Sequence, residues 1–431
     1  LFMFFGKKLS KKPIINRYFV SGMLISMSIS GMSVGVNAQE ILTLNDAISL
    51  SLQQHPELHV FTHKSEAAKA LITQAEVGTP KVVNAQLEDF LGSGNNSGVS
   101  GLQATLSISW LLENDIIESR VNLASSKADA TTIDQEVKAV DIAANTARLY
   151  ITLLAQKENL KLAKIAEDQA KDLLDNVEGR VKAAKANAID ELRARASLSL
   201  YELEVEDLVH EIAATKSALA AQWKGTTNFS VTGTLTNIPS ISELDEVLKR
   251  LKENPKIQRY ILQQQEIESE IDLAVVEESP AWEVSTGIRR NEVIDDFAFV
   301  AGISIPIGGE GRNKGLITSL RAKQSQSAAE SDALLQSIST DALLLTHKLK
   351  HSLHVIQKLS NSSIPMLEQA NEQASRAYNI GSYSYTDLFA VQKELLNAQK
   401  SLIDAYTNIQ LFNIELERLT GTSVSKNERA L

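Results

Sequence analysis

The stretch LQATLSISW (residues 102–110) decides the fold class. Apolar side chains alternate strictly with polar ones from Leu102 to Trp110. A period of two predicts a β-strand with one apolar and one polar face, which suits a sheet that meets two different media. With similar alternation in three other segments, four strands are expected, at 82–91, 101–112, 282–290 and 297–307.

Long helical segments follow each pair of strands. Residues 115–178 contain no Pro and no Gly, so they can form one helix of about 96 Å. Residues 312–377 form a similar segment, in which Pro365 predicts a kink or a local irregularity. Apolar residues from Leu388 to Leu419 recur at spacings of three and four, the heptad pattern of a coiled coil.

The chain also shows an internal repeat. Each half is predicted to contain a short helix, a second helix, two strands, a very long helix and a long helix. Three landmarks recur in the same order at offsets of 199, 200 and 196 residues: Pro56 with Pro255, Pro80 with Pro280, and Gly225 with Gly421. A duplicated unit is therefore expected, with halves at 39–235 and 236–431.

The first 38 residues have the pattern of a signal peptide. Five basic residues precede an apolar run at 18–36, and Val36-Asn37-Ala38 offers small residues for cleavage before Gln39. A membrane anchor is the alternative. Removing 1–38 leaves 38 basic and 53 acidic residues, a net charge of −15, which disfavours nucleic-acid binding. The sequence has no Cys, which excludes disulfides and thiolate metal sites.

Four amphipathic strands cannot close a membrane barrel by themselves, because such barrels need about eight or more. Three chains would supply twelve strands and leave no open edge. Trp110 and Trp282 fall in the apolar register at the helix-proximal end of the strands, where a membrane girdle belongs. A soluble β-sandwich with two buried tryptophans is the alternative.

Several motifs resemble those of the TolC-type outer-membrane efflux protein family. They are LTLNDAI (42–48), HPEL (55–58), SIPIGG (304–309) and, most specifically, RAYNIGSYSYTDL (376–388) followed by Gln392. The resemblance covers essentially the whole chain after the signal segment, and its short loops are most similar to the cation-efflux (CzcC-like) branch. It implies an α+β membrane fold: a trimeric β-barrel with four strands per chain, continued by a long periplasmic α-helical coiled-coil barrel.

The resemblance also implies a function and partners. The chain would be the outer-membrane exit duct of a tripartite efflux system in a Gram-negative bacterium, extending into the periplasm. Its partners would be two further copies, a periplasmic adaptor protein and an inner-membrane transporter of the RND type. Heavy-metal cations or drugs would pass through it passively. The alternatives are a duct for type I protein secretion and a soluble periplasmic coiled-coil scaffold.

The turns near 179–187 and 378–384 are expected to join pairs of long helices far from the membrane. In the family, such turns form the gate and contact the adaptor. The gate candidates are Asp190, Asp387, Arg180 and Arg376. The adaptor-contact candidates are Gly381, Ser384, Tyr385, Ala184 and Asn187.

Two readings of the aspartates remain open. In a trimer, Asp190 and Asp387 would form two carboxylate rings that attract cations, and Arg180 and Arg376 would latch the closed state. The alternative is helix capping, because Asp near a helix start stabilises the helix without any gating role. Alanine at position 184, where the second half has Gly381, also argues against equal use of both turns.

The polar register of the strands is expected to line a water-filled lumen. Its candidate residues are Asn84, Gln86, Glu88, Gln103, Thr105, Ser107, Glu283, Ser285 and Arg289.

Enzymatic activity has no sequence support. There is no nucleophile elbow, HExxH motif or phosphate-binding loop, and no cofactor is expected. Two histidine sets have helical spacing, around His59 and around His351. A solvated helix face is favoured over a metal site for both, so no metal ligand is predicted.

Overall fold

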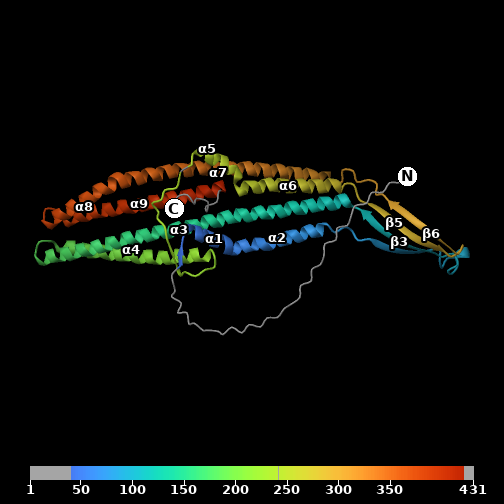
Figure 1. Cartoon of the computed structure of the whole chain (residues 1–431), viewed down its shortest axis with the longest axis horizontal. Coiled ribbons are helices and arrows are strands. Elements are labelled where there is room, and N and C mark those ends of the chain that lie inside the picture. The colour runs from blue at the N-terminus through green and yellow to red at the C-terminus, as the bar shows by residue number, and fades with distance from the viewer. Residues whose placement is uncertain (1–39, 241, 422–431) are drawn as a thin grey trace, which may run out of the picture. The chain divides into compact units, whose positions relative to one another are not determined.

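The computed structural model describes residues 40–240 and 242–421, and the expected signal segment 1–38 lies outside them. Long helices run side by side, with a sheet beyond one of their ends (Figure 1). The first half contains α1 (Leu44–Gln54), α2 (Pro56–Ala75), β2 (Val82–Glu88), β3 (Gln103–Leu112), α3 (Asn114–Lys182) and α4 (Ala188–Ala221). The second half contains α5 (Leu244–Arg250), α6 (Pro255–Val276), β5 (Trp282–Asn291), β6 (Asp296–Ser304), α7 (Lys314–Lys358), α8 (Ile364–Asn379) and α9 (Tyr385–Thr420).

The order of elements in the first half recurs in the second. The starts of α2 and α6 show the same local chemistry. Each helix begins with a proline, Pro56 or Pro255, after an N-cap residue whose side chain accepts a backbone N–H. Proline suits the first helical turn because its missing N–H would have no partner there.

Strands β2, β3, β5 and β6 form one antiparallel sheet in that order. Paired residues share a face: Leu106 lies opposite Ala85 and Ile288, and Ile288 lies opposite Phe299. This apolar face is exposed, with Leu106 at 59% and Phe299 at 92%. The other face carries polar side chains, of which Thr105 and Ser109 are buried. The strands lie within three residues of the expected bounds at every end.

Helix α3 runs without interruption for 69 residues, about 100 Å. Its counterpart in the second half is divided. A short π-helical segment, Leu359–Ser363, separates α7 from α8, and Pro365 lies in the first turn of α8. Proline cannot donate the usual helical hydrogen bond, and its ring crowds the carbonyl four residues earlier. The expected irregularity therefore lies directly before Pro365.

None of the helices in the described ranges is both long enough and apolar enough to cross a membrane.

A compact core holds the middle of the helices together. The short parallel strands β1 (Glu40–Leu42) and β4 (Phe229–Val231) pack there against α1 and α3. Tyr150 of α3 is 1% exposed, and its hydroxyl donates to the carbonyl oxygens of Leu42, at 2.8 Å, and Thr232. Burial raises the pKa of Tyr150 to about 12, so its hydroxyl stays a protonated donor at all physiological pH values.

Replacing Tyr150 by phenylalanine should lower the stability of this core. The change removes the hydroxyl that donates to the Leu42 and Thr232 carbonyl oxygens, at a cost of about 1 kcal/mol. Thermal unfolding in detergent would measure it, with Tyr383→Phe, at an exposed tyrosine, as the control. Equal melting temperatures for both variants and the wild type would contradict this role.

Candidate functional sites at the hairpin turns and the sheet

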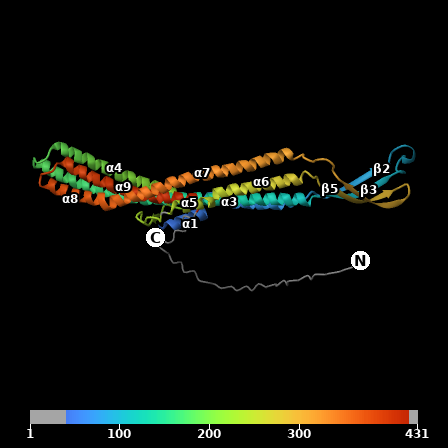
Figure 2. The same ribbon diagram turned by 90° about the horizontal axis from the view of Figure 1, so that it is seen from above.

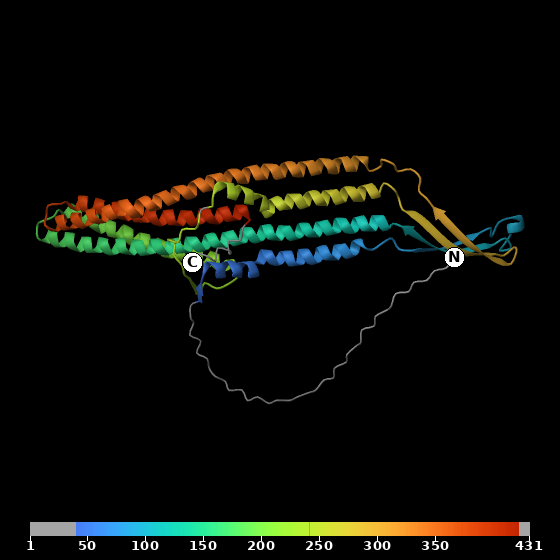
Figure 3. The ribbon, with the colours of Figure 1, turned by 45° about the horizontal axis from the view of Figure 1, so that its top comes forward.

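The α3–α4 turn and the α8–α9 turn lie together at the end of the helices opposite the sheet (Figures 2 and 3). Helices α3 and α4 form the first hairpin, and α8 and α9 form the second. A cluster of buried side chains joins the two hairpins, including Val177 from α3 and Tyr378 from α8. The backbone turns out of α3 and out of α8 in the same way. Ala184 has φ 55° and Gly381 has φ 83°, both in the left-handed region.

Ala184 should be a strained residue, because a Cβ atom disfavours the left-handed region. We expect Ala184→Gly to stabilise the protein by roughly 1 kcal/mol, and Gly381→Ala to destabilise it by a similar amount. Thermal unfolding of the two variants would measure both effects. A lower melting temperature for Ala184→Gly would show that the turn is not strained.

The two aspartates occupy capping positions. The Asp387 amide donates to the Ser384 hydroxyl at 3.2 Å, and that hydroxyl donates back to the Asp387 carboxylate at 2.6 Å. Asp190 lies in the first turn of α4, whose N-cap is Asn187. Asn187 accepts the amide of Ile189 at 3.0 Å. Capping therefore accounts locally for Ser384, Asp387 and Asn187.

The two arginine candidates differ. Arg180 of α3 donates to the backbone carbonyl of Tyr378 at 2.6 Å and lies 4.5 Å from the centre of its ring. It therefore links the first hairpin to the second. Arg376 instead forms an ion pair with Glu372 of its own helix, and its side chain is largely exposed. Within one chain, Arg180 therefore spans the two hairpins and Arg376 does not; a latch formed by either residue stays a prediction.

A second arginine that links the hairpins was missed from the sequence. Arg193 of α4 donates to the Thr386 hydroxyl at 3.0 Å and lies 5.8 Å from the ring centre of Tyr385. Arg180 and Arg193 thus both extend from the first hairpin onto the second, and we call them the arginine clamp. No spacing in the sequence marks Arg193, because its partners lie nearly 200 residues away.

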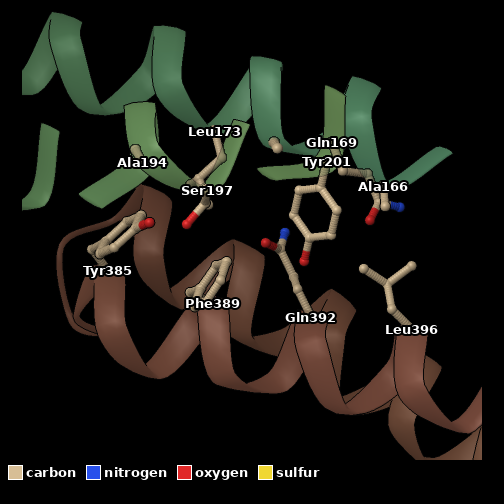
Figure 4. A pocket seen from close by; sticks show the side chains of 11 residues that line it. Ala166, Gln169, Leu173, Ala194, Ser197, Tyr201, Tyr385, Phe389, Gln392 and Leu396 are labelled. Carbon is tan, nitrogen blue, oxygen red and sulfur yellow. The ribbon is translucent and has the colours of Figure 1, made fainter. Parts of the chain in front are cut away.

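Tyr385 is not available as a surface contact. Its side chain is 3% exposed and stacks on Phe389 with ring centres 6.0 Å apart. It borders a small cavity of about 10 Å³ between α3, α4 and α9, beside Ser197, Tyr201 and Gln392 (Figure 4). Burial raises the pKa of the Tyr385 hydroxyl. The burial corrects the expectation that Tyr385 contacts an adaptor, and its role is packing between the hairpins.

The other adaptor-contact candidates are exposed at the turns. They are Gly381, Ser384, Ala184 and Asn187.

The sheet brings all nine lumen candidates onto its polar face. The register aligns Gln86, Thr105 and Arg289 in one row across three strands, and Glu88 with Gln103 in the next. Asn84 and Ser107 form a third row, and Ser285 and Glu283 continue the same face towards the helices. Arg289 donates to Thr105 and Gln103 and pairs with Glu88.

Both girdle tryptophans lie on the apolar face at the helix-proximal end of the sheet. Trp282 is opposite Leu112, and Trp110 is opposite Val284. Trp282 is 52% exposed and Trp110 is half-buried. An aromatic side chain with this exposure at the edge of an apolar band is typical of a membrane interface.

Within residues 40–240 and 242–421, no group of three or more His, Asp or Glu side chains is arranged to hold a metal ion.

Comparisons with known proteins agree with this geometry. Residues 47–223 match the model of the family described as outer membrane efflux protein. The cobalt-zinc-cadmium resistance protein CzcC of Cupriavidus metallidurans is 25% identical over 363 residues, which cover 83% of this chain and 85% of CzcC.

Solved structures share the fold at lower identity. CusC, whose structures describe folding and transmembrane channel formation, superposes with a TM-score of 0.70 at 16% identity, over 88% of this chain and 92% of CusC. The outer membrane protein VceC of Vibrio cholerae gives 0.70 at 18%, over 88% of this chain and 96% of VceC. Residues 47–223 thus match the outer membrane efflux protein family, most of the chain is similar to CzcC, and the fold is that of the solved channels CusC and VceC.

Proposed function

We propose that this chain is the exit duct of a tripartite efflux system that expels divalent metal cations. Three copies would close one barrel in the outer membrane, and their long helices would form a periplasmic tube. An adaptor protein and an inner-membrane pump of the RND type would deliver the cations. The two duplicated halves, 39–235 and 236–431, would each supply two strands and one helical hairpin.

The observation that carries this proposal is the two-faced sheet. Its apolar face exposes large side chains such as Phe299 and Ile303. Contact with lipid is favourable for such side chains, whereas contact with water is not. Its strands β2 and β6 are unpaired edges, which a neighbouring copy would cover. A soluble coiled-coil scaffold would leave this apolar face in contact with water, so that alternative is disfavoured.

The hairpin turns are the proposed entrance. In a trimer, Asp190 and Asp387 would lie in two rings near the end of the tube, where fixed negative charge attracts cations. Capping and attraction are compatible, because a carboxylate that accepts a hydrogen bond, as that of Asp387 does from the Ser384 hydroxyl, keeps its charge. The exposed turn residues Gly381, Ser384, Ala184 and Asn187 are the proposed adaptor contacts.

Metal cations are favoured over drugs as the substrate because CzcC, named for cobalt, zinc and cadmium resistance, is similar to most of this chain. The test is the susceptibility of a deletion strain to cobalt, zinc, cadmium, copper and hydrophobic drugs. Sensitivity confined to metals, and reversed by the intact gene, is expected. Sensitivity to drugs alone would identify a multidrug duct, and unchanged growth together with loss of an exported protein would favour protein secretion.

A further inference from the structure

The polar face of the sheet carries an uneven set of charges. In the strands as described, its ionisable side chains are Glu88, Glu283, Asp296 and a single basic residue, Arg289. Glu88 and Asp296 belong to the row nearest the loops that connect β2 to β3 and β5 to β6, and Arg289 belongs to the next row. One positive charge is therefore placed directly behind the last acidic row.

Arg289 is held in place by three neighbours on two other strands. Its Nε donates to the Thr105 hydroxyl at 2.9 Å, and its Nη1 donates to the Gln103 amide oxygen at 3.3 Å. Its Nη2 lies 3.5 Å from a carboxylate oxygen of Glu88. The planar guanidinium is suited to this arrangement, because its donors have a fixed fork geometry.

The side chain is also accessible. The side chain of Arg289 is 36% exposed and that of Glu88 is 40% exposed, so both charged groups contact solvent on the polar face of the sheet. A fixed charge on a pore wall changes the local concentration of ions of each sign. Arg289 offsets the charge of Glu88, so the outer row attracts cations less strongly than its carboxylates alone would.

We propose that Arg289 is a specificity-determining residue of the duct, which limits the preference of the outer exit for cations. The inference rests on the proposed function, in which three copies place this face around the lumen. A moderate preference suits an exit, because conduction requires that an ion bind weakly enough to leave. The acidic residues Asp190 and Asp387 lie at the opposite end and are separate from this site.

The test measures the cation-to-anion permeability ratio of purified trimers in planar bilayers under a potassium chloride gradient. Arg289→Gln should raise the ratio about twofold or more, and Glu88→Gln should lower it by a similar factor. The double variant should return close to the wild-type ratio, because its net charge is unchanged. Arg289→Lys should also keep that ratio if charge is what matters.

Arg290 provides the matched control. It is adjacent in sequence but lies on the opposite face, where it pairs with Glu292 and Asp295. Arg290→Gln should leave the ratio unchanged. The effects at positions 88 and 289 should also be larger at about 0.1 M salt than at 1 M, since salt screens fixed charges.

The outcomes are distinguishable. Trimers of every variant that conduct with the wild-type ratio would overturn the inference and leave the duct intact. A ratio that falls in Arg289→Gln would overturn it as well. Folded wild-type protein that forms no conducting trimer would overturn the proposed function itself.

Discussion

Replacing Leu106 by arginine should remove most of the protein from the outer membrane. Leu106 lies on the apolar face of the sheet, with Ala85 and Ile288 beside it, and its side chain is 59% exposed. Arginine on the lipid face near the middle of a membrane barrel costs about 2–4 kcal/mol. A trimer would carry that cost three times, so we expect at least a tenfold loss of assembled protein.

Asn84→Arg is the matched control for this prediction. Asn84 lies on the adjacent strand opposite Ser107, on the polar face, where arginine would remain in water. Fractionation of membranes and the heat stability of trimers on gels would measure both variants. Equal outer-membrane levels of Leu106→Arg and Asn84→Arg would mean that the apolar face does not contact lipid.

Removing the arginine clamp should open the periplasmic entrance. Arg180 and Arg193 make charge-assisted hydrogen bonds from the first hairpin to the second and lie against the rings of Tyr378 and Tyr385. Together these contacts contribute on the order of 3 kcal/mol. The double variant Arg180→Ala/Arg193→Ala should therefore shift the hairpins towards a separated state and raise single-channel conductance severalfold.

Arg195 offers a control of the same residue type. It pairs with Glu178 and Glu191, both of the first hairpin, so Arg195→Ala should not affect the junction between hairpins. Single-channel recordings of the two variants would measure the difference. A clamp variant that conducts like Arg195→Ala would show that the clamp does not hold the entrance closed.

The sequence was informative wherever a pattern was long and local. Period-two alternation located β3 and β5, and the absence of breakers predicted α3. Strands β1 and β4 were not predicted, because three residues are too few for a period and their pairing joins segments about 190 residues apart. The polar face was predicted well because side chains in a strand must alternate.

The hairpin site was predicted less well, since its contacts join residues far apart in the chain. Arg180 was identified as a candidate, but its contact with the backbone carbonyl of Tyr378 was not predicted. Tyr385 was a candidate adaptor contact because of its place in the family motif, whereas its position on α9 directs its ring between the hairpins. Such outcomes depend on the rotation of packed helices, which spacing in one chain does not specify.

The most direct test of the account is the release of cadmium from loaded cells. Deletion cells that carry the wild-type gene should release the metal, whereas cells with an empty vector or with Leu106→Arg should retain several times more of it. Such a result requires a duct that is inserted in the outer membrane and passes metal cations. Release at the same rate from all three strains would contradict the central claim.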